Sequence, residues 1–339
     1  MQLQYCYENI NRSCEKNTWS NNIRIPMYIF MVTTILATVA GNLAVIISIA
    51  HFKQLHTPTN YLILSMATAD FLLACLVMPY SMMRSVEHCW YFGELFCKIH
   101  TSTDIMLSTT SIFHLSFISV DRYYAVCDPL RYKIRMNIFI VLLMIIISWM
   151  IPAIYAFGMI FLELNIKGAE TYYYQDVSCV GGCFLFFTET SGGVSTIISF
   201  FIPAFIMICV YGKIYVIARR QARSIKDAAS QMQFHMTLED RQHFSRNRER
   251  KAAKTLGIIM GVFLICWTPF FVSIAINPFQ NYVIKPIIVD AFMWIGYLNS
   301  TFNPMIYAFF YMWFRRALKL ILFGKVFSLD SSRTILYSE

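Results

Sequence analysis

The stretch Cys97–Val126, CKIHTSTDIMLSTTSIFHLSFISVDRYYAV, decides the fold. It is apolar enough for a membrane helix, yet Asp104 lies inside it and Asp121-Arg122-Tyr123 stands near its end. A carboxylate at the centre of a membrane helix costs about 3 kcal/mol or more unless a polar or cationic group meets it, so it is a functional-site candidate. At about 1.5 Å per residue the two acids lie roughly 25 Å apart. One helix therefore carries an acid suited to a cationic ligand near its outer end and an acid–base pair near its inner end.

The composition also requires a membrane protein. Of the 339 residues, 57% are hydrophobic and 14% are charged, whereas a soluble domain carries about 25% charged residues. A spanning helix needs about 20 residues. Seven segments meet that length: Met27–Ala50, Tyr61–Met83, Cys97–Val126, Ile138–Phe161, Val194–Ile217, Ala253–Ile276 and Ile287–Phe310. The sequence predicts an all-α membrane protein in which residues 1–339 form a single seven-transmembrane helix bundle.

Lysines and arginines in the connecting segments indicate the orientation. They concentrate after the first, third and fifth spans and in the tail, while the other side has only scattered cations such as Arg84, Lys167 and Lys285. The positive-inside rule then puts residues 1–26 outside and the tail in the cytoplasm. Since residues 1–24 are polar, we expect no cleavable signal peptide. The sequon at Asn11 fits glycosylation on the outer side.

Two polar segments are expected on the cytoplasmic side. Residues 224–250 predict a flexible basic loop, for which a solvated linker near anionic lipid is an equally good interpretation. Residues 311–339 begin with Met312–Phe323, where aromatic and leucine side chains alternate with cations. That pattern is typical of a short amphipathic eighth helix lying on the membrane, followed by the tail. The third, fifth and sixth spans are expected to continue as helix into the cytoplasm.

Short motifs occur in order along the spans: Gly41-Asn42, Leu64–Asp70, Asp121-Arg122-Tyr123, Trp149, Pro203, Cys266-Trp267-Thr268-Pro269 and Asn303-Pro304-Met305-Ile306-Tyr307. Together they resemble the rhodopsin-like G-protein-coupled receptors. The run Asn299–Pro304, followed by Tyr307, Tyr311 and Trp313-Phe314, resembles the fingerprint of trace amine-associated receptors, and the whole chain resembles a rodent-like form of that family's first member. The resemblance implies a receptor, not an enzyme, for small primary arylalkylamines such as phenethylamine and tyramine. Such a receptor activates a stimulatory G protein and raises cyclic AMP.

Asp104 is the expected counter-ion of the protonated amine, because a charge-assisted hydrogen bond is among the strongest single contacts in a desolvated pocket. The alternative is an acid satisfied by a neighbouring tyrosine or by the backbone, but no Lys or Arg falls in the predicted outer halves of the spans. The resemblance implies that Tyr297 holds this carboxylate, with Ser108 also at the site. A retinal Schiff base would need a lysine where Tyr297 stands.

Trp267, Phe270 and Phe271 are spaced i, i+3 and i+4, on one helical face. The resemblance makes them an aromatic box for the ligand ring, joined by Trp294 and Phe186; ordinary helix packing is the alternative. At the ring end, Ser195, Thr196 and Ser199 resemble residues that bond ring hydroxyls, with Ser199 favoured. Serine and threonine in membrane helices also bond their own i−4 carbonyl, so that interpretation stays open.

Six of the ten cysteines fall outside the membrane, where oxidation is expected: Cys6, Cys14, Cys89, Cys97, Cys179 and Cys183. The resemblance implies the pairs Cys97–Cys183 and Cys6–Cys179, with Cys14 as a substitute for Cys6 in the second pair. The other four cysteines are expected to be reduced packing residues. No metal site is predicted apart from a sodium ion.

At the inner end, the resemblance implies an ion pair between Arg122 and Glu249 that holds the receptor closed; a solvated glutamate is the alternative. The residues expected to act with this switch are Asp121, Tyr211, Tyr307, Ile112, Pro203 and Phe263. Asp70 with Ser111, Asn299 and Asn303 resembles an allosteric sodium site, and a water-linked bridge is the alternative. Sodium there would favour the closed state. We expect no other cofactor.

Two other functional classes fit the sequence less well. A transporter would be expected to contain an internal repeat, and none is detectable. A peptide receptor of the same fold is disfavoured by Asp104 with Tyr297. Nucleic-acid binding is excluded by the seven spans despite a net charge of +9. The expected partners are an amine, a stimulatory G protein and membrane lipid, with a homo- or heterodimer left open. The expected location is the plasma membrane, with intracellular membranes as the alternative.

Overall fold

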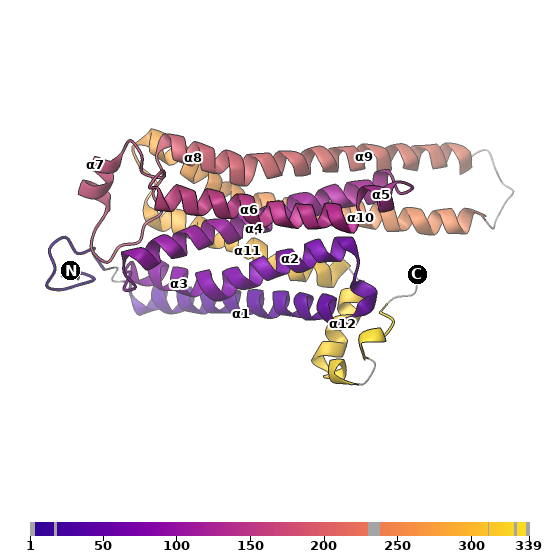
Figure 1. Cartoon of the computed structure of the whole chain (residues 1–339), viewed down its shortest axis with the longest axis horizontal. Coiled ribbons are helices and arrows are strands. Elements are labelled where there is room, and N and C mark those ends of the chain that lie inside the picture. The colour runs from indigo at the N-terminus through magenta and orange to yellow at the C-terminus, as the bar shows by residue number, and fades with distance from the viewer. Residues whose placement is uncertain (1–3, 17–18, 230–237, 311, 329–330, 337–339) are drawn as a thin grey trace.

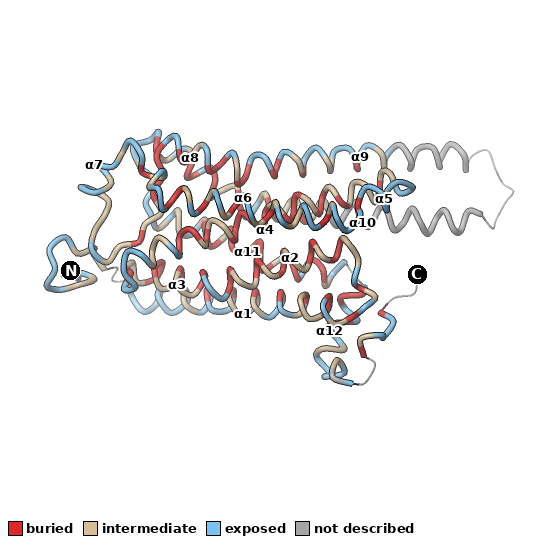
Figure 2. The backbone as a smooth tube through the Cα atoms, viewed as in Figure 1, coloured by how far each residue is buried: buried red, intermediate tan, exposed pale blue. Residues whose placement is uncertain are grey.

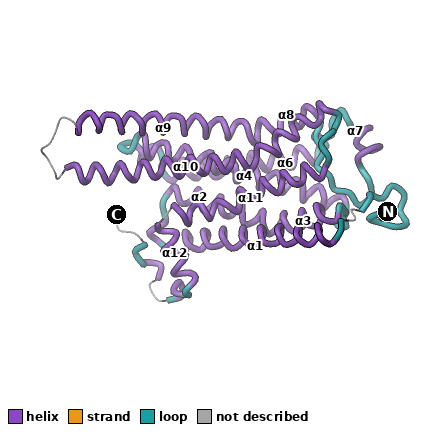
Figure 3. The backbone as a smooth tube through the Cα atoms, turned by 180° about the vertical axis from the view of Figure 1, so that it is seen from behind, coloured by secondary structure: helices purple, strands orange, loops and turns teal. Residues whose placement is uncertain are grey.

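The computed structural model describes residues 4–16, 19–229, 238–310, 312–328 and 331–336, and the side chains of 218, 220–256 and 327 are not described. Within these ranges helices account for all the regular structure except two isolated bridges. The helices run side by side in an elongated bundle (Figure 1). The N-terminus lies at one end, and the C-terminus lies toward the other. The view from behind shows the same arrangement, with α9 and α10 reaching beyond the other helices (Figure 3).

Seven helical rods make up the bundle. Five are single helices: α1 (Asn21–His51), α4 (Glu94–Cys127), α6 (Ile138–Phe161), α10 (Leu238–Ile276) and α11 (Pro286–Phe310). The second rod joins α2 (Pro58–Leu72), η2 (Leu73–Val77) and α3 (Met78–Glu87), and the fifth joins α8 (Glu189–Thr196), η4 (Ile197–Phe201) and α9 (Ile202–Ala229). The turns η2 and η4 are π-helical. The predicted fold class is confirmed.

Short elements connect the rods: η1 (Lys53–Leu55), α5 (Tyr132–Arg135), α7 (Glu170–Tyr172), η3 (Tyr173–Val177) and η5 (Asn277–Gln280). Local signals explain several helix starts. The Thr57 side chain accepts a hydrogen bond from the Asn60 N–H, with Pro58 in the first turn of α2, and Asn137 caps α6 by accepting from the Ile140 N–H at 3.0 Å. Such caps satisfy backbone donors that a helix leaves unpaired.

Burial separates the helices by role. Exposed apolar side chains such as Ile29, Leu36, Phe139 and Ile154 cover the outer faces of α1 and α6, while buried residues follow the inward faces of the bundle (Figure 2). Five rods are both long and apolar enough to cross a membrane on composition alone, and α4 and α11 are not among them. These two helices carry the buried polar side chains of the interior. Asp104 is one of the buried polar residues of α4.

Most of the helices extend beyond the ends of the predicted spans. The fourth predicted span, Ile138–Phe161, is confirmed without change. The first begins at Asn21 rather than Met27, so residues 21–26 are helical and not part of an irregular N-terminus. The predicted loop 224–250 is helical over 224–229 and 238–250, and 230–237 lies outside the described residues. Hydropathy does not detect such extensions, because residues 21–26 and 238–252 contain few apolar residues.

The predicted eighth helix is present as α12 (Met312–Leu322). Trp313, Phe314 and Ala317 are buried, whereas Leu322 and Phe323 are exposed. The short turns η6 (Lys325–Phe327) and η7 (Ser331–Arg333) follow. Leu336 is buried in the apolar core, and its carbonyl accepts from Arg316 Nη1 at 2.8 Å. The described part of the tail therefore packs back against the bundle.

Three disulfides fasten the outer end of the bundle, and one prediction about them is wrong. Cys97–Cys183 is confirmed. Cys6 pairs with Cys89, and Cys14 pairs with Cys179, so the predicted Cys6–Cys179 bridge is absent. The four cysteines of the spans lie outside these bridges.

Backbone pairing explains this connectivity. The Cys14 N–H donates to the Val180 carbonyl at 3.0 Å, and the Val180 N–H donates to the Arg12 carbonyl at 2.9 Å. This alignment sets Cys14 beside Cys179. The Cys6 N–H then donates to the Cys14 carbonyl at 2.9 Å, which brings Cys6 close to Cys89. Asn11 lies in an exposed turn of this N-terminal segment.

Candidate functional site

The Asp104 carboxylate is buried on α4 and meets the partners that the sequence predicts. The Tyr297 hydroxyl on α11 donates to Asp104 Oδ2 at 2.6 Å. Ser108, one turn along α4, donates to Oδ1 at 3.3 Å, a longer and weaker contact. Tyr297 is completely buried, and its hydroxyl also lies 3.3 Å from Ser81 Oγ. The tyrosine therefore fixes one carboxylate oxygen and leaves the other mostly available to a ligand.

A buried cation close to this acid corrects one premise of the sequence analysis. Arg84 was assigned to the outer connecting segments, but it lies on α3 and its side chain is only 7% exposed. Its Nη2 is 3.7 Å from Asp290 Oδ1 on α11 and 3.5 Å from Met293 Sδ. Ser81, one turn before Arg84 on α3, lies 3.3 Å from the Tyr297 hydroxyl that donates to Asp104. The outer half of the bundle thus contains an acid–base–acid group, of which sequence reasoning identified one member.

Hydrogen bonds tie this group to the neighbouring side chains. Ser85 donates to Asp290 Oδ2 at 3.4 Å, and Trp294 Nε1 donates to Ser85 Oγ at 3.2 Å. Trp294 also packs edge-on against Tyr297, with ring centroids 5.4 Å apart. Trp294, predicted as a wall of the aromatic box, is therefore connected to the Asp104 site through two contacts.

The predicted aromatic box is assembled on α10. Trp267, Phe270 and Phe271 are all buried, and their ring centroids lie 5.3–6.0 Å apart. Phe200 from η4 stacks on Phe271 at 5.1 Å. Gly296 lets the Trp267 ring approach α11, since a Cβ on that glycine would lie 2.7 Å from the ring. This packing leaves Trp267 Nε1 buried without a hydrogen-bond partner among the described residues.

The serine and threonine residues predicted to bond the hydroxyl of the ligand ring differ in their hydrogen bonds. Thr196 Oγ1 donates to the Gly192 carbonyl at 2.8 Å, the i−4 bond typical of threonine in membrane helices. Ser199 instead accepts from Thr109 Oγ1 on α4 at 3.1 Å. Ser195 is buried. The Tyr155 hydroxyl on α6 faces Ser195 and Ser199 without meeting hydrogen-bond geometry. Tyr155 and Thr109 were not predicted from the sequence as neighbours of these serines.

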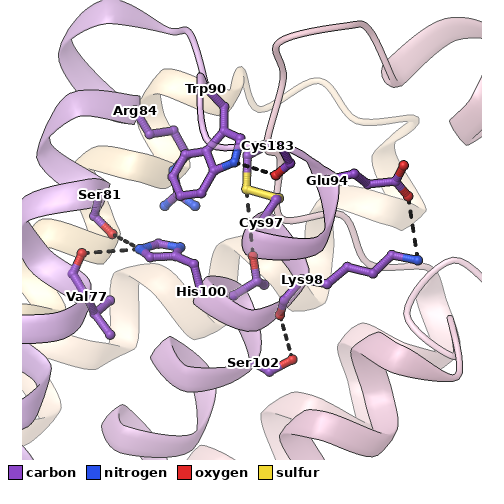
Figure 4. The surroundings of a disulfide bond; sticks show 12 residues. Val77, Ser81, Arg84, Trp90, Glu94, Cys97, Lys98, His100, Ser102 and Cys183 are labelled. Carbon is purple, nitrogen blue, oxygen red and sulfur yellow. Dashed lines mark hydrogen bonds and ion pairs between the residues drawn. A yellow bond between two sulfur atoms is a disulfide. The ribbon is translucent and has the colours of Figure 1, made fainter.

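Phe186 lies in a cover made of aromatic residues from the outer loops. Its ring stacks on Tyr282 at 4.8 Å and packs near Tyr173 at 5.4 Å. Nearby, Lys98 donates to Glu163 Oε1 at 2.9 Å, and this hydrogen bond lowers the pKa of the Glu163 carboxyl. Arg84, Ser81, His100 and Trp90 gather beside the Cys97–Cys183 bridge (Figure 4). The Cys97–Cys183 bridge therefore joins this cover to α4 above the buried acid.

Asp70 forms a second buried acidic centre. Its carboxylate accepts from Ser300 Oγ at 2.7 Å and from Asn303 Nδ2 at 2.8 Å. Ser111 Oγ and both side-chain polar atoms of Asn299 are buried without a hydrogen-bond partner among the described residues. Unpaired polar groups beside a buried carboxylate fit a small hydrated cation. The predicted sodium-site residues thus fit a sodium ion, and Ser300 is an additional contact that was not predicted.

The Asp121-Arg122 pair at the inner end belongs to a closed hydrogen-bond network. Arg122 Nε and Nη2 donate to Asp121 Oδ2 at 2.8 and 2.5 Å. Thr59 on α2 donates to both oxygens of Asp121 at 3.0 Å, and the Tyr132 hydroxyl on α5 donates to Oδ1 at 2.9 Å. Arg122 Nη2 also donates to Thr59 Oγ1 at 2.8 Å. The arginine is therefore held by its own motif and by α2.

The other predicted switch residues are only partly tested. Glu249 lies in α10, but its side chain is outside the described part of the chain, so the Arg122–Glu249 pair stays a prediction. Ile112 and Phe263 are completely buried in one apolar core, and Pro203 is buried on α9. Tyr307 is buried. The ring of Tyr211 packs against Gly257, where an added Cβ would lie 2.8 Å from its hydroxyl.

Taken together, the bundle and its interior define a seven-helix membrane receptor with a buried acidic site near one end and an acid–base network near the other. Comparison with known proteins agrees with that class. Residues 41–307 match the model of the 7 transmembrane receptor (rhodopsin family).

The chain is also similar to several curated receptors along its whole length. It is 64% identical to trace amine-associated receptor 1 of Macaca mulatta and of Homo sapiens over 337 residues, which cover 99% of each chain. It is 57% identical to trace amine-associated receptor 1 of Mus musculus over 335 residues, 99% of this chain and 100% of the mouse protein. The chain therefore belongs to the rhodopsin family of seven-transmembrane receptors and, within it, to the trace amine-associated receptors. It is a receptor and not an enzyme. The expected rodent-like character is not supported, because the primate sequences are more similar than the mouse one.

Proposed function

We propose that this receptor binds small primary arylalkylamines such as phenethylamine and tyramine and activates a stimulatory G protein, which raises cyclic AMP. The observation that carries the proposal is the Asp104 carboxylate, buried but with only one short hydrogen bond. A protonated primary amine supplies the missing charge-assisted donors. Its ring would lie against the Trp267, Phe270 and Phe271 side chains, where a cation also gains from the aromatic faces.

The polar side chains near α8 and η4 support a preference among amines. Ser199 accepts from Thr109 and so has a hydrogen to donate, while Thr196 uses its hydrogen on the Gly192 carbonyl. Tyr155 brings a third hydroxyl to the same place. A para-hydroxyl on the ligand ring would therefore bond Ser199 rather than Thr196. An amine of about ten heavy atoms buries little area, so the Asp104 contact must dominate its affinity.

The signalling part of the proposal uses the inner network. Opening of α10 would expose a groove for a G-protein helix, and an Arg122–Glu249 pair would oppose that opening. Sodium at Asp70, with Ser111, Asn299 and Asn303, would favour the closed state by binding it preferentially. The proposal includes an outside N-terminus glycosylated at Asn11, a cytoplasmic C-terminus, and residence in the plasma membrane.

The test compares Asp104→Asn with wild type at matched surface expression. We expect phenethylamine to raise cyclic AMP in wild type and to have no effect through Asp104→Asn. Asp176→Asn, which removes an exposed acid of the outer loop, is the matched control and should respond as wild type. An unchanged concentration–response curve for Asp104→Asn would refute the site. Displacement of bound phenethylamine by peptides, unaffected by that substitution, would favour a peptide receptor instead.

The sodium proposal has a separate test. Sodium chloride should weaken agonist binding to wild-type membranes compared with choline chloride at equal ionic strength. Asp70→Asn removes the only carboxylate among the four residues and should abolish that difference. A sodium effect of the same size in Asp70→Asn would show that the ion acts elsewhere.

A further inference from the structure

We propose that Arg84 is a specificity-determining residue, which neutralises Asp290 beside Asp104 and so restricts the amine pocket to ligands that carry one positive charge. The inference rests on the proposed role of Asp104 as the amine counter-ion. It extends that role by stating which class of amine the pocket rejects. Arg84 was not among the predicted site residues.

Burial makes the charge of Arg84 effective. Its side chain is 7% exposed and that of Asp290 is 20% exposed, so little water screens either group. The contact between them is a loose one of 3.7 Å, and Arg84 Nε has no hydrogen-bond partner among the described residues. A buried guanidinium that is incompletely paired is costly to keep. Ser81, one turn before Arg84 on α3, lies 3.3 Å from the Tyr297 hydroxyl that donates to Asp104, so this charge lies close to the amine site.

The charges around the ligand amine can be counted. Asp290 is connected to Asp104 through Ser85, Trp294 and Tyr297, and Arg84 forms an ion pair with Asp290. Two carboxylates and one guanidinium leave one net negative charge. Six other ions at this end form pairs nearer the surface: Lys98 with Glu94 and Glu163, and Arg24 and Lys16 with Glu87.

His100 is the remaining titratable group beside Arg84, and its contacts describe a neutral ring. Its Nε2 lies 3.2 Å from the Val77 carbonyl and 3.3 Å from Ser81 Oγ. A proton on Nε2 satisfies the carbonyl. Nδ1 is buried with no partner among the described residues, so a second proton there would be a buried donor without an acceptor. His100 therefore adds no charge to the count.

One net negative charge matches one ammonium group. A ligand with a second ammonium on the side of α3 and α11 would bring two positive charges to the Arg84 guanidinium. Three cations would then face two carboxylates, which leaves one positive charge without a partner. Without Arg84, the same pocket would hold two carboxylates and suit a dication. The proposal thus predicts that Arg84 excludes diamines whose second ammonium extends from the amine end of the molecule, away from the ring.

The experiment is competition binding on membranes that contain the full-length receptor, with tritiated phenethylamine as the probe. Two competitors of similar length are compared: N-butylphenethylamine with one cation, and N-(3-aminopropyl)phenethylamine with two. Wild type should prefer the monocation. In Arg84→Met, which keeps an unbranched side chain beside Met293, the ratio of the two affinities should shift toward the dication by about tenfold, equivalent to ~1.4 kcal/mol.

Three further variants make the result specific. Arg84→Lys keeps the charge and should keep the wild-type ratio. Arg24→Met removes an exposed cation at the same end of the bundle and should also keep it. The double variant Arg84→Met with Asp290→Asn returns the count to one negative charge and should restore the wild-type ratio.

The outcomes separate the two proposals. If wild-type membranes bind no phenethylamine, the proposed function fails, and this inference fails with it. If phenethylamine binds normally but Arg84→Met leaves the ratio unchanged, only the role of Arg84 is refuted. Loss of all binding in Arg84→Met that the double variant does not restore would also refute it, because Arg84 would then act through packing and not through charge.

Discussion

Tyr297→Phe should weaken phenethylamine binding and signalling through the loss of one oxygen atom. The substitution keeps the completely buried ring and removes the hydroxyl that donates to Asp104 Oδ2 at 2.6 Å. A hydrogen bond to a charged group contributes about 1.5–3 kcal/mol. Without it, Asp104 keeps only the 3.3 Å contact from Ser108 and is less firmly oriented toward the ligand.

The lost hydrogen bond sets the size of the effect. The amine must then orient the Asp104 carboxylate itself, so most of the lost hydrogen-bond energy appears as lost affinity. We expect phenethylamine to be weaker by about tenfold to about a hundredfold. The assay is competition binding together with cyclic AMP concentration–response curves, at surface expression matched by an N-terminal tag.

Tyr155→Phe is the matched control. It removes the same atom from a buried hydroxyl that has no hydrogen-bond partner among the described residues, and phenethylamine offers that hydroxyl nothing to bond. Its affinity should equal that of wild type. If Tyr297→Phe binds phenethylamine within about threefold of wild type, a difference below 1 kcal/mol, the hydroxyl does not organise Asp104 and the reasoning is refuted.

Three further expectations can be checked with the same expression system. Ser199→Ala should lower the affinity for tyramine about tenfold relative to phenethylamine, whereas Thr196→Ala should affect both ligands equally; competition binding with the two amines distinguishes these results. Cys6→Ser and Cys89→Ser should reduce surface expression equally, with no further loss in the double variant, and an additive loss would contradict their pairing. Glu249→Ala should raise cyclic AMP without agonist, and no increase at matched expression would exclude the ion pair with Arg122.

The parts of the fold that follow from local chemistry were predictable. Helix ends that coincide with a change from apolar to polar residues were located correctly, as with Ile138–Phe161. The ends of α1 and α10 were not, since an amphipathic extension has no excess of apolar residues for hydropathy to detect. That an acid in the membrane requires a polar partner follows from its chemistry, whereas the particular partners Tyr297 and Asn303 were implied by the resemblance to the receptor family.

Arg84 and the disulfides illustrate what the sequence leaves undetermined. Hydropathy ended the second span at Met83 because Arg84 is charged, although a buried arginine one residue later continues the same helix. Six oxidised cysteines allow 15 connectivities, and backbone pairing between residues 12–14 and Val180 selects the observed one. Both errors concern contacts between segments distant in sequence. In each case a partner that no local pattern identifies decides where the residue lies.

The buried carboxylates of Asp70, Asp104 and Asp121 accept different numbers of hydrogen bonds. That number distinguishes their roles better than burial does, since all three are buried. Asp121 receives five hydrogen bonds of 2.5–3.0 Å from Thr59, Arg122 and Tyr132, so it has no capacity for a ligand and suits a structural latch. Asp70 and Asp104 each receive two. A carboxylate has about four acceptor sites, so both retain room for a cation. Asp70 lies among unpaired amide and hydroxyl groups, which favour a small hydrated ion. Asp104 accepts from Tyr297, whose ring packs edge-on against Trp294, and this aromatic surrounding supports the proposal that its cation is an organic ammonium.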